Sequence, residues 1–193
     1  MTEGERVLKK ITVVLLFALL LSVLAACGTD PADGTDTSAV PTERENRYVF
    51  RGVSLVLPGN YVVEETSYGT IAYAVEEKDR SDNIHFSVSE ADSVSGYTRE
   101  SIEKVYDGIA DGYEGIEYYE QKEIDGVDVL VYRYHLKAER LRVEQTQVIV
   151  FFPDRSVVLT FTGATGAYSS AFERAVQSIR IVPEEPAATE NTN

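Results

Sequence analysis

Short apolar runs separated by turn signals dominate the chain between residues 47 and 182. In Ile84–Val88, apolar residues alternate with polar ones, which is typical of a strand with one buried face. The runs before it are bounded by turn residues such as Pro58-Gly59-Asn60 and also predict strands. These runs are Val53–Leu57, Tyr61–Glu65 and Gly69–Val75.

The hydrophobic period changes at Thr98, which suits the N-cap of a helix. Apolar residues then recur at the spacing of one helix face. They are Ile102, Val105, Tyr106, Ile109 and Tyr113. A second helix is predicted over Ser169–Ile181, where Phe172, Val176 and Ile179 form an apolar stripe.

Four strands with short connections are predicted between the two helices, which indicates an antiparallel meander. The Asp125-Gly126 pair favours a tight type I′ hairpin turn. A two-residue turn there places Ile124 opposite Val127 and Tyr119 opposite Tyr132. The four strands are Ile116–Ile124, Val127–Leu136, Leu141–Phe152 and Val157–Thr162.

Two segments, Val127–Tyr132 and Val148–Phe152, are almost continuously apolar. A strand that is apolar on both sides is usually covered on both sides, so helices or loops are expected on each face of the sheet. The order of strands, helix, strands and helix predicts an α+β fold with a mostly antiparallel β-sheet sandwiched by helices.

The first 26 residues have the pattern of an export signal. Basic residues precede an apolar segment, Ile11–Leu24, which is shorter than the roughly 20 apolar residues that a spanning helix needs. The next residues, Leu24-Ala25-Ala26-Cys27, resemble the lipobox of bacterial lipoproteins. The resemblance implies cleavage before Cys27, a diacylglycerol on its thiol and an N-acyl chain such as palmitate. The alternatives are an uncleaved anchor helix and an ordinary secretory signal cut near Ala26.

Polar, low-complexity segments flank the globular part. Residues 28–46 contain one branched aliphatic residue, Val40, and residues 183–193 have a similar composition. Neither can bury enough apolar surface to offset its ordering entropy. The predicted organisation is a cleaved signal peptide at 1–26, lipidated Cys27 with a disordered tether to 46, a domain at 47–182 and a disordered tail.

The charge is strongly acidic, with 18 Lys and Arg against 32 Asp and Glu and a net charge of −14. Removal of residues 1–26 leaves 15 basic and 30 acidic residues, a net charge of −15. Such a surface repels nucleic acid and anionic membranes, so the acyl chains must hold the protein at the bilayer. With one cysteine, Cys27, no internal disulfide can form.

Catalytic and metal-binding motifs are absent from the sequence. His85 and His135 lie in separate predicted strands, where each is expected at the surface or edge of the sheet. There is no His-x-x-x-His pair for zinc and no Gly-x-Ser-x-Gly turn for a nucleophilic serine. We therefore predict no enzyme activity and no cofactor besides the lipid on Cys27. An enzyme would require a hidden cluster, such as His135 meeting an acid.

Tyrosine is abundant, with twelve residues and no tryptophan. Tyr118, Tyr119, Tyr132 and Tyr134 lie on two adjacent predicted strands, with Arg133 opposite Tyr118. Tyrosine provides rigid contact area at low entropic cost, so these five residues form a candidate binding surface. The alternative is that the tyrosines pack at the rim of the sheet.

The order of elements resembles the PsbP-like fold, which includes DcrB-like and LpqN-like bacterial lipoproteins. The landmarks are Phe50, Val53, Leu55, Pro58, the helix near Thr98, the Asp125-Gly126 hairpin, Phe172, Ser178 and Ile179. The resemblance implies a non-enzymatic accessory or binding role and supplies no catalytic residues. We expect an extracytoplasmic module, lipid-anchored to the bacterial cell membrane, that binds an envelope protein. The alternative is a carrier or sensor for a small apolar or glycan ligand held between sheet and helix.

Overall fold

The computed structural model describes residues 46–67, 69–75, 81–109, 112–138, 141–164 and 169–183. The predicted signal peptide, the lipobox with Cys27 and the tether up to residue 45 lie outside the described residues, as does the tail from residue 184. None of the helices in the described ranges has the length and apolar character needed to cross a bilayer.

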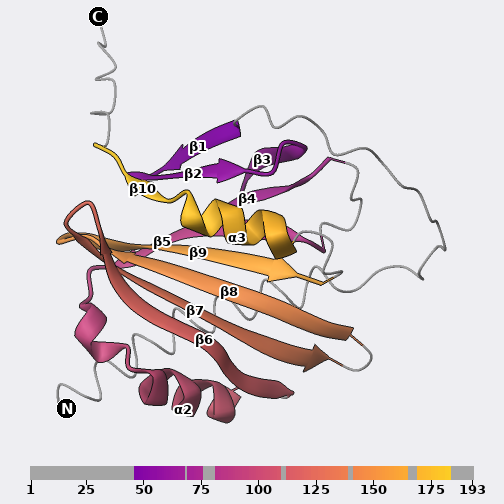
Figure 1. Ribbon diagram of the computed structural model, residues 1–193, viewed down its shortest axis with the longest axis vertical. Helices are drawn as coiled ribbons and strands as arrows, with labels where there is room; N and C mark the ends of the chain where they lie inside the picture. Colours follow the sequence, from indigo (N-terminus) through magenta and orange to yellow (C-terminus); the bar gives the residue numbers. More distant parts are fainter. Residues whose placement is uncertain are drawn as a thin grey trace, which may run out of the picture.

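Ten strands and two α-helices follow one another along the described chain, and their labels are those of Figure 1. The first half contains β1 (Asn46–Phe50), β2 (Val53–Leu57), β3 (Tyr61–Thr66), β4 (Gly69–Ala74), β5 (Asn83–Glu90), the short 3-10 helix η1 (Val94–Gly96) and α2 (Arg99–Ile109). The second half contains β6 (Tyr113–Ile124), β7 (Val127–Ala138), β8 (Leu141–Phe151), β9 (Arg155–Gly163), α3 (Ser169–Gln177) and β10 (Arg180–Ile181).

The strands form two antiparallel sheets. Seven strands lie in the order β3-β4-β5-β9-β8-β7-β6, and three in the order β1-β2-β10. The predicted meander is confirmed, because β6, β7, β8 and β9 are neighbours in chain order. Figure 1 shows α2 on one face of the large sheet, with α3 and the small sheet on the other. The predicted α+β class and the covering of both faces are confirmed, although strands as well as α3 cover one of them.

Each face of the large sheet has its own hydrophobic core. Because side chains alternate along a strand, Val129 and Val131 of β7 join the core under α3, while Leu130 and Tyr132 join the core over α2. Other members under α3 are Leu55, Phe86, Val148, Leu159 and Phe172. Other members over α2 are Ile102, Tyr106, Ile149, Phe151 and Val158.

The structure confirms the local predictions at the hairpin and at the start of α2. Asp125 and Gly126 have φ angles of 52° and 82°, as a type I′ turn requires. The register pairs Ile124 with Val127 and Tyr119 with Tyr132, as predicted. The hydroxyl of Thr98 accepts a hydrogen bond from the Ser101 backbone N–H at 3.1 Å, which confirms the N-cap.

Two predicted helical boundaries are wrong. Helix α3 ends at Gln177, because the Ser178 hydroxyl donates to the Ala175 carbonyl at 2.7 Å and accepts from the Val56 N–H at 2.8 Å. The chain then forms β10 along β2, and Ile179 is buried after the helix rather than within it. Tyr113 belongs to β6 and stacks on Tyr106, with ring centroids 5.1 Å apart.

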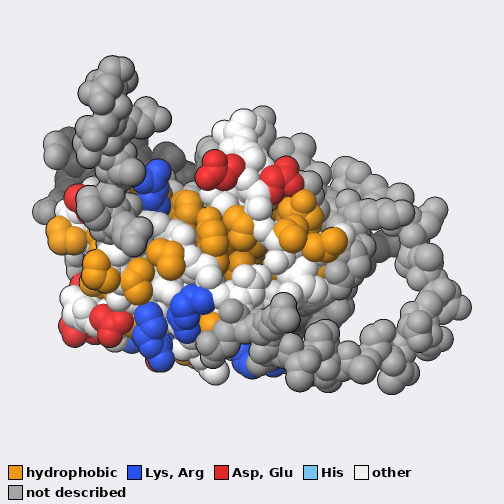
Figure 2. All heavy atoms as spheres, turned by 90° about the horizontal axis from the view of Figure 1, so that it is seen from above, with side chains coloured by type: hydrophobic (Ala, Val, Ile, Leu, Met, Phe, Trp, Pro, Cys, Tyr) orange, Lys and Arg blue, Asp and Glu red, His pale blue; other side chains and the backbone are white. Residues whose placement is uncertain are grey.

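The described residues begin with a strand, β1, that the apolar pattern does not predict and that starts at Asn46, the last residue of the expected tether. Viewed from above, the molecule presents a band of hydrophobic side chains bordered by charged ones (Figure 2). Among large apolar side chains that remain exposed, Val49 lies on β1, and Val62 and Val63 lie on β3.

Candidate functional site

An open groove of about 290 Å³ separates α3 from strands β6, β7 and β8. Its sheet side carries Tyr118, Glu120, Lys122, Val131, Arg133, Glu144 and Thr146. Its helix side carries Ser169, Phe172, Glu173, Val176 and Gln177. Phe172, Ala175 and Ile179 fill the space directly beneath α3, where they join the buried core. The groove is therefore a polar surface cleft with an apolar floor.

The five residues of the predicted binding surface do not share one face. Tyr118 and Arg133 are register partners on the groove face. Tyr132 and Tyr134 point to the opposite face and are fully buried in the core over α2. Tyr119 also lies on that face, where its hydroxyl donates to the Tyr97 carbonyl at 2.6 Å. The prediction of one surface is wrong because adjacent residues of a strand point to opposite sides.

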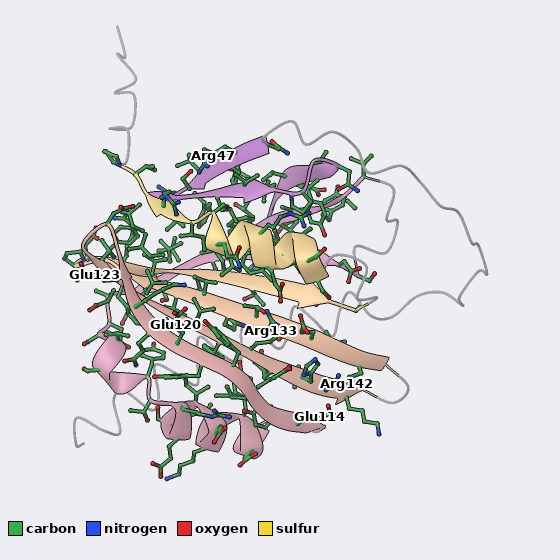
Figure 3. The ribbon with its side chains drawn as sticks, viewed as in Figure 1. Arg47, Glu114, Glu120, Glu123, Arg133 and Arg142 are labelled. Carbon is green, nitrogen blue, oxygen red and sulfur yellow. The ribbon has the colours of Figure 1, made fainter. Side chains whose placement is uncertain are left out.

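Arg133 is held by one neighbouring strand, β8, and by helix α3. Its Nε donates to Thr146 Oγ1 at 3.3 Å and lies 3.8 Å from Glu144 Oε1. Its terminal nitrogen lies 3.3 Å from Glu173 Oε1 on α3. Figure 3 shows Arg133 on the sheet between α3 and β6. The guanidinium therefore has a set position on the sheet side of the groove and connects α3 to the sheet.

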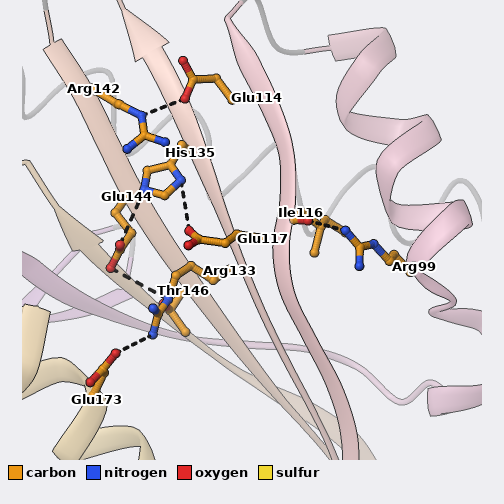
Figure 4. Close-up of polar contacts among 10 residues, drawn as sticks. All are labelled: Arg99, Glu114, Ile116, Glu117, Arg133, His135, Arg142, Glu144, Thr146 and Glu173. Carbon is orange, nitrogen blue, oxygen red and sulfur yellow. Dashed lines mark hydrogen bonds and ion pairs between the residues drawn. The ribbon is translucent and has the colours of Figure 1, made fainter.

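A second polar cluster continues from Arg133 along the strands. His135 of β7 is the register partner of Glu144 of β8, and its Nε2 lies 3.5 Å from Glu144 Oε2. On the other side, its Nδ1 lies 3.4 Å from Glu117 Oε2 of β6. Figure 4 shows the imidazole between the two carboxylates. The histidine is buried and its strand is internal, so the prediction of a surface or edge position is wrong for His135.

His85 is also buried, on β5 between β4 and β9, so the same prediction is wrong there. Its imidazole lies against Gly69: a Cβ added to that glycine would come within 2.8 Å of His85 Nε2. His85 pairs with Thr160 of β9. Its neighbours Ile84 and Phe86 join the core under α3, so alternation places His85 on the face opposite the groove. The structure therefore keeps the two histidines apart, and only His135 lies near the groove.

Irregular pairing of β6 with β7 brings Glu117 to this cluster. Ile116 pairs with Tyr134, whereas Tyr118 pairs with Arg133, so β6 has one extra residue at this point. A further shift lies between Tyr113 and Ile116, where Gly115 has a φ of +89°. Such β-bulges re-aim side chains at strand edges. Without the bulge, strict alternation would place Glu117 on the face opposite Tyr118.

Ion pairs border the cluster. Arg142 Nε donates to Glu114 Oε2 at 2.7 Å, and this bond lowers the pKa of the exposed Glu114 carboxyl. Nearer the hairpin, Lys122 donates to Glu120 at 2.8 Å and, together with the Tyr118 hydroxyl, lowers the pKa of Glu120. The hydrogen bond to Glu120 raises the pKa of Tyr118. Cationic and anionic groups thus alternate along the groove face.

On the opposite face, over α2, a buried network of hydrogen bonds lies within the hydrophobic core. The Tyr106 hydroxyl donates to the Tyr134 hydroxyl at 2.8 Å, which donates to Gln145 Oε1 at 2.5 Å. Gln145 Nε2 then donates to Thr162 Oγ1 at 3.2 Å. Burial raises the pKa of Tyr134 to about 12 and the pKa of Tyr106 well above its ordinary value. The Tyr106 and Tyr134 hydroxyls already have hydrogen-bond partners inside the core, so we interpret the network as structural.

Sequence reasoning missed Glu117, Glu144, Thr146 and Glu173. Strand alternation from Arg133 could have placed His135 on the same face, and the Leu141–Phe152 strand could have suggested Glu144. The sequence carried no signal for the bulge at Glu117 or for the approach of Glu173 on α3. The lipobox residues Leu24, Ala25, Ala26 and Cys27 lie outside the described residues and stay a prediction.

Comparison with known proteins supports the fold alone. No family model matches the chain, and no curated protein matches it in sequence. A solved structure of cyanobacterial PsbP (CyanoP) from Synechocystis sp. PCC 6803 matches with a TM-score of 0.55 and 13% identity, over 75% of this chain and 97% of that one. LpqN of Mycobacterium tuberculosis, described as involved in cell envelope biogenesis, matches with a TM-score of 0.49 and 12% identity, over 74% and 88%. The architecture and the CyanoP match together show that this chain has a PsbP-like α+β fold.

Proposed function

We propose that this protein is a lipid-anchored, extracytoplasmic, non-enzymatic module that binds an envelope protein through the groove beside α3. The open groove at Arg133 carries the binding part of the proposal. The lipobox at Leu24–Cys27 and the polar segment after it support the anchor and the extracytoplasmic location. The acidic net charge of −14 supports a partner with basic side chains and disfavours nucleic acid.

The groove has the features of a protein-binding surface. Tyr118 is 43% exposed at its rim, and Arg133 is already held in one geometry before any partner arrives. Tyrosine and arginine are the residues that most often dominate binding energy, and preorganised side chains lose little entropy on binding. Alternating charges along β6, β7 and β8 provide specificity for a polar segment.

A small polar ligand such as a glycan is the second candidate. The same mixed polar lining, with Tyr118 available for stacking, favours it. An apolar ligand between sheet and helix is disfavoured, because Phe172, Ala175 and Ile179 occupy that space.

The anchor is tested by Cys27→Ser in the native host. We expect the wild-type protein in the detergent phase and the variant as either a soluble protein or an unprocessed precursor. Two acyl chains bind a bilayer stably, whereas the acidic polypeptide has no such attraction. Detergent phase separation of cell extracts shows in which phase each protein lies, and its apparent mass shows whether it was processed. A processed variant that still partitions fully into detergent would refute the anchor.

The groove is tested by placing a photo-cross-linking amino acid at Tyr118 in living cells, with Val62 as the matched exposed control. A discrete adduct from position 118, lost on Arg133→Ala but kept with the exposed control Arg180→Ala, would support a groove-bound protein. Equal adducts from both positions, or adducts indifferent to Arg133→Ala, would overturn it. Saccharide-specific chemical shifts at the groove without any protein adduct would favour the glycan.

A further inference from the structure

We propose that Glu117, His135 and Glu144 form a binding site for a divalent transition-metal ion of the zinc class. Each residue comes from a different strand, β6, β7 and β8, at the end of the groove beyond Arg133. One donor atom from each residue lies within 4.8 Å of the other two. The site does not depend on the proposed anchor or on an envelope partner.

The separations of these groups suit a metal better than a closed ion pair. The His135 nitrogens lie 3.4 Å and 3.5 Å from the carboxylate oxygens. Charge-assisted hydrogen bonds usually measure about 2.7–2.9 Å. Two ligands bound at about 2.0–2.2 Å in a tetrahedral site lie about 3.3–3.5 Å apart. Whichever ring nitrogen binds the ion, one carboxylate already stands at that separation.

With Nε2 as the ligand nitrogen, Glu144 already stands at the required separation, and the remaining adjustment falls on Glu117, the most movable ligand. The Glu117 side chain is 60% exposed, so it can move toward the ion without disturbing the core. Glu144 is half-buried, and His135 is almost fully buried between β6 and β8. A site with two set ligands and one adjustable ligand can accept an ion from solvent and leave its remaining positions to water.

A neighbouring cation positions the Glu144 ligand. Arg133 approaches Oε1 of this carboxylate, while Oε2 is the oxygen that faces His135. Arg133 itself is held by Thr146 and Glu173. Partners of this kind, in contact with a ligand rather than with the metal, orient the ligand and strengthen binding. Arg133 is therefore a positioning residue for the site.

The donor set selects the class of ion. Two carboxylates and a neutral imidazole carry a charge of −2, which a divalent ion balances. Calcium and magnesium prefer oxygen ligands throughout, whereas imidazole favours zinc and its first-row neighbours. We therefore expect Zn²⁺ to bind in preference to Mg²⁺ and Ca²⁺.

The test is calorimetric titration of Zn²⁺ into the full-length chain in detergent, without a histidine tag. Cys27→Ser removes the single thiol, so that it cannot compete for zinc. We expect one site per chain, weakened roughly 10-fold to 100-fold or more by His135→Ala or Glu144→Gln. Glu114→Gln is the matched control, since Glu114 is a nearby acid paired with Arg142. It should leave the affinity unchanged.

Folding is checked by denaturant unfolding of each variant without metal. His135→Gln provides a second substitution if His135→Ala unfolds. Arg133→Met should weaken zinc binding less than His135→Ala does, because Arg133 acts through Glu144. Equal affinity in wild-type and folded His135 variants, or Mg²⁺ binding as tight as Zn²⁺ binding, would overturn the site and indicate surface carboxylates alone.

Discussion

The two faces of the large sheet use the same strands for different purposes. On the α2 face, Tyr132, Tyr134 and Gln145 are fully buried, and Tyr134 and Gln145 hydrogen-bond to their neighbours. On the α3 face, the adjacent residues Arg133 and Glu144 line an open groove. Between Tyr132 and Tyr134, each step along β7 therefore moves between a buried structural side chain and one that lines the groove. Neighbours in sequence can have unrelated roles when they belong to a strand covered on both sides.

The largest effect is expected when a buried side chain on the α2 face is truncated. Tyr134→Ala should lower the free energy of unfolding by about 3–5 kcal/mol, because it leaves a cavity and unpaired partners in the core over α2. Tyr118→Ala, on the open face, should cost less than about 1 kcal/mol. Denaturant unfolding of both variants gives the comparison. Similar losses would show that the two faces are not distinct in stability.

The second-largest effect is expected from alkaline pH, which should lower folding stability through the buried Tyr134 on the α2 face. The pKa of Tyr134 is raised by burial to about 12 from 10.0 in a solvated tyrosine. The folded state then holds a proton that the unfolded state releases, so stability is complete below about pH 10 and is lost as pH rises toward 12. This loss amounts to about 2–3 kcal/mol.

Unfolding measured at about pH 9 and about pH 11, with absorbance to follow tyrosinate, checks the pH effect. Tyr118→Phe should reduce the loss less than Tyr134→Phe does, since Tyr118 is exposed and its raised pKa comes first from one hydrogen bond to Glu120. Tyr134→Phe should reduce it. If wild type and Tyr134→Phe lose equal stability across this range, the Tyr134 hydroxyl does not contribute as described.

A third test addresses the irregular pairing of β6 at Gly115, which directly precedes the bulge at Glu117. Gly115→Ala should cost about 1–2 kcal/mol, because Gly115 has a φ of +89° and no atom within 4 Å of an added Cβ, so that the cost is one of backbone conformation. Gly59→Ala is the matched control: its Cβ also meets nothing within 4 Å, and Gly59 is not among the positive-φ glycines. Denaturant unfolding should separate them, and equal costs would contradict the conformational explanation.

The smallest effect is expected from Glu173→Gln on α3. Its carboxylate is 54% exposed beside Arg133, and exposed ion pairs contribute about 0–1 kcal/mol. Denaturant unfolding should therefore barely change, while the groove loses one charge. A loss above about 1 kcal/mol would show that the ion pair, rather than the apolar contacts of Phe172, holds α3 on the sheet.

Local rules determined much of the fold from the sequence alone. Alternation and turn chemistry predicted the meander, the Asp125-Gly126 hairpin and the N-cap at Thr98, because each depends on neighbours in the chain. The same rules predicted that both faces of the sheet would be covered. The lipobox at Leu24–Cys27 is likewise a local pattern, and it stays a prediction about residues outside the described structure.

Tertiary structure alone decided the sites. The extra residue at Glu117 depends on how β6 pairs with β7, and no local pattern encodes that register. Glu144 meets His135 through strand pairing. Glu173 lies 40 positions after Arg133 in the sequence and reaches it because α3 packs back across the sheet. Strand β10 forms for a similar reason, since two residues gain strand geometry only from the edge of β2. Contacts between distant residues are set by packing, and that is where the groove and the proposed metal site arise.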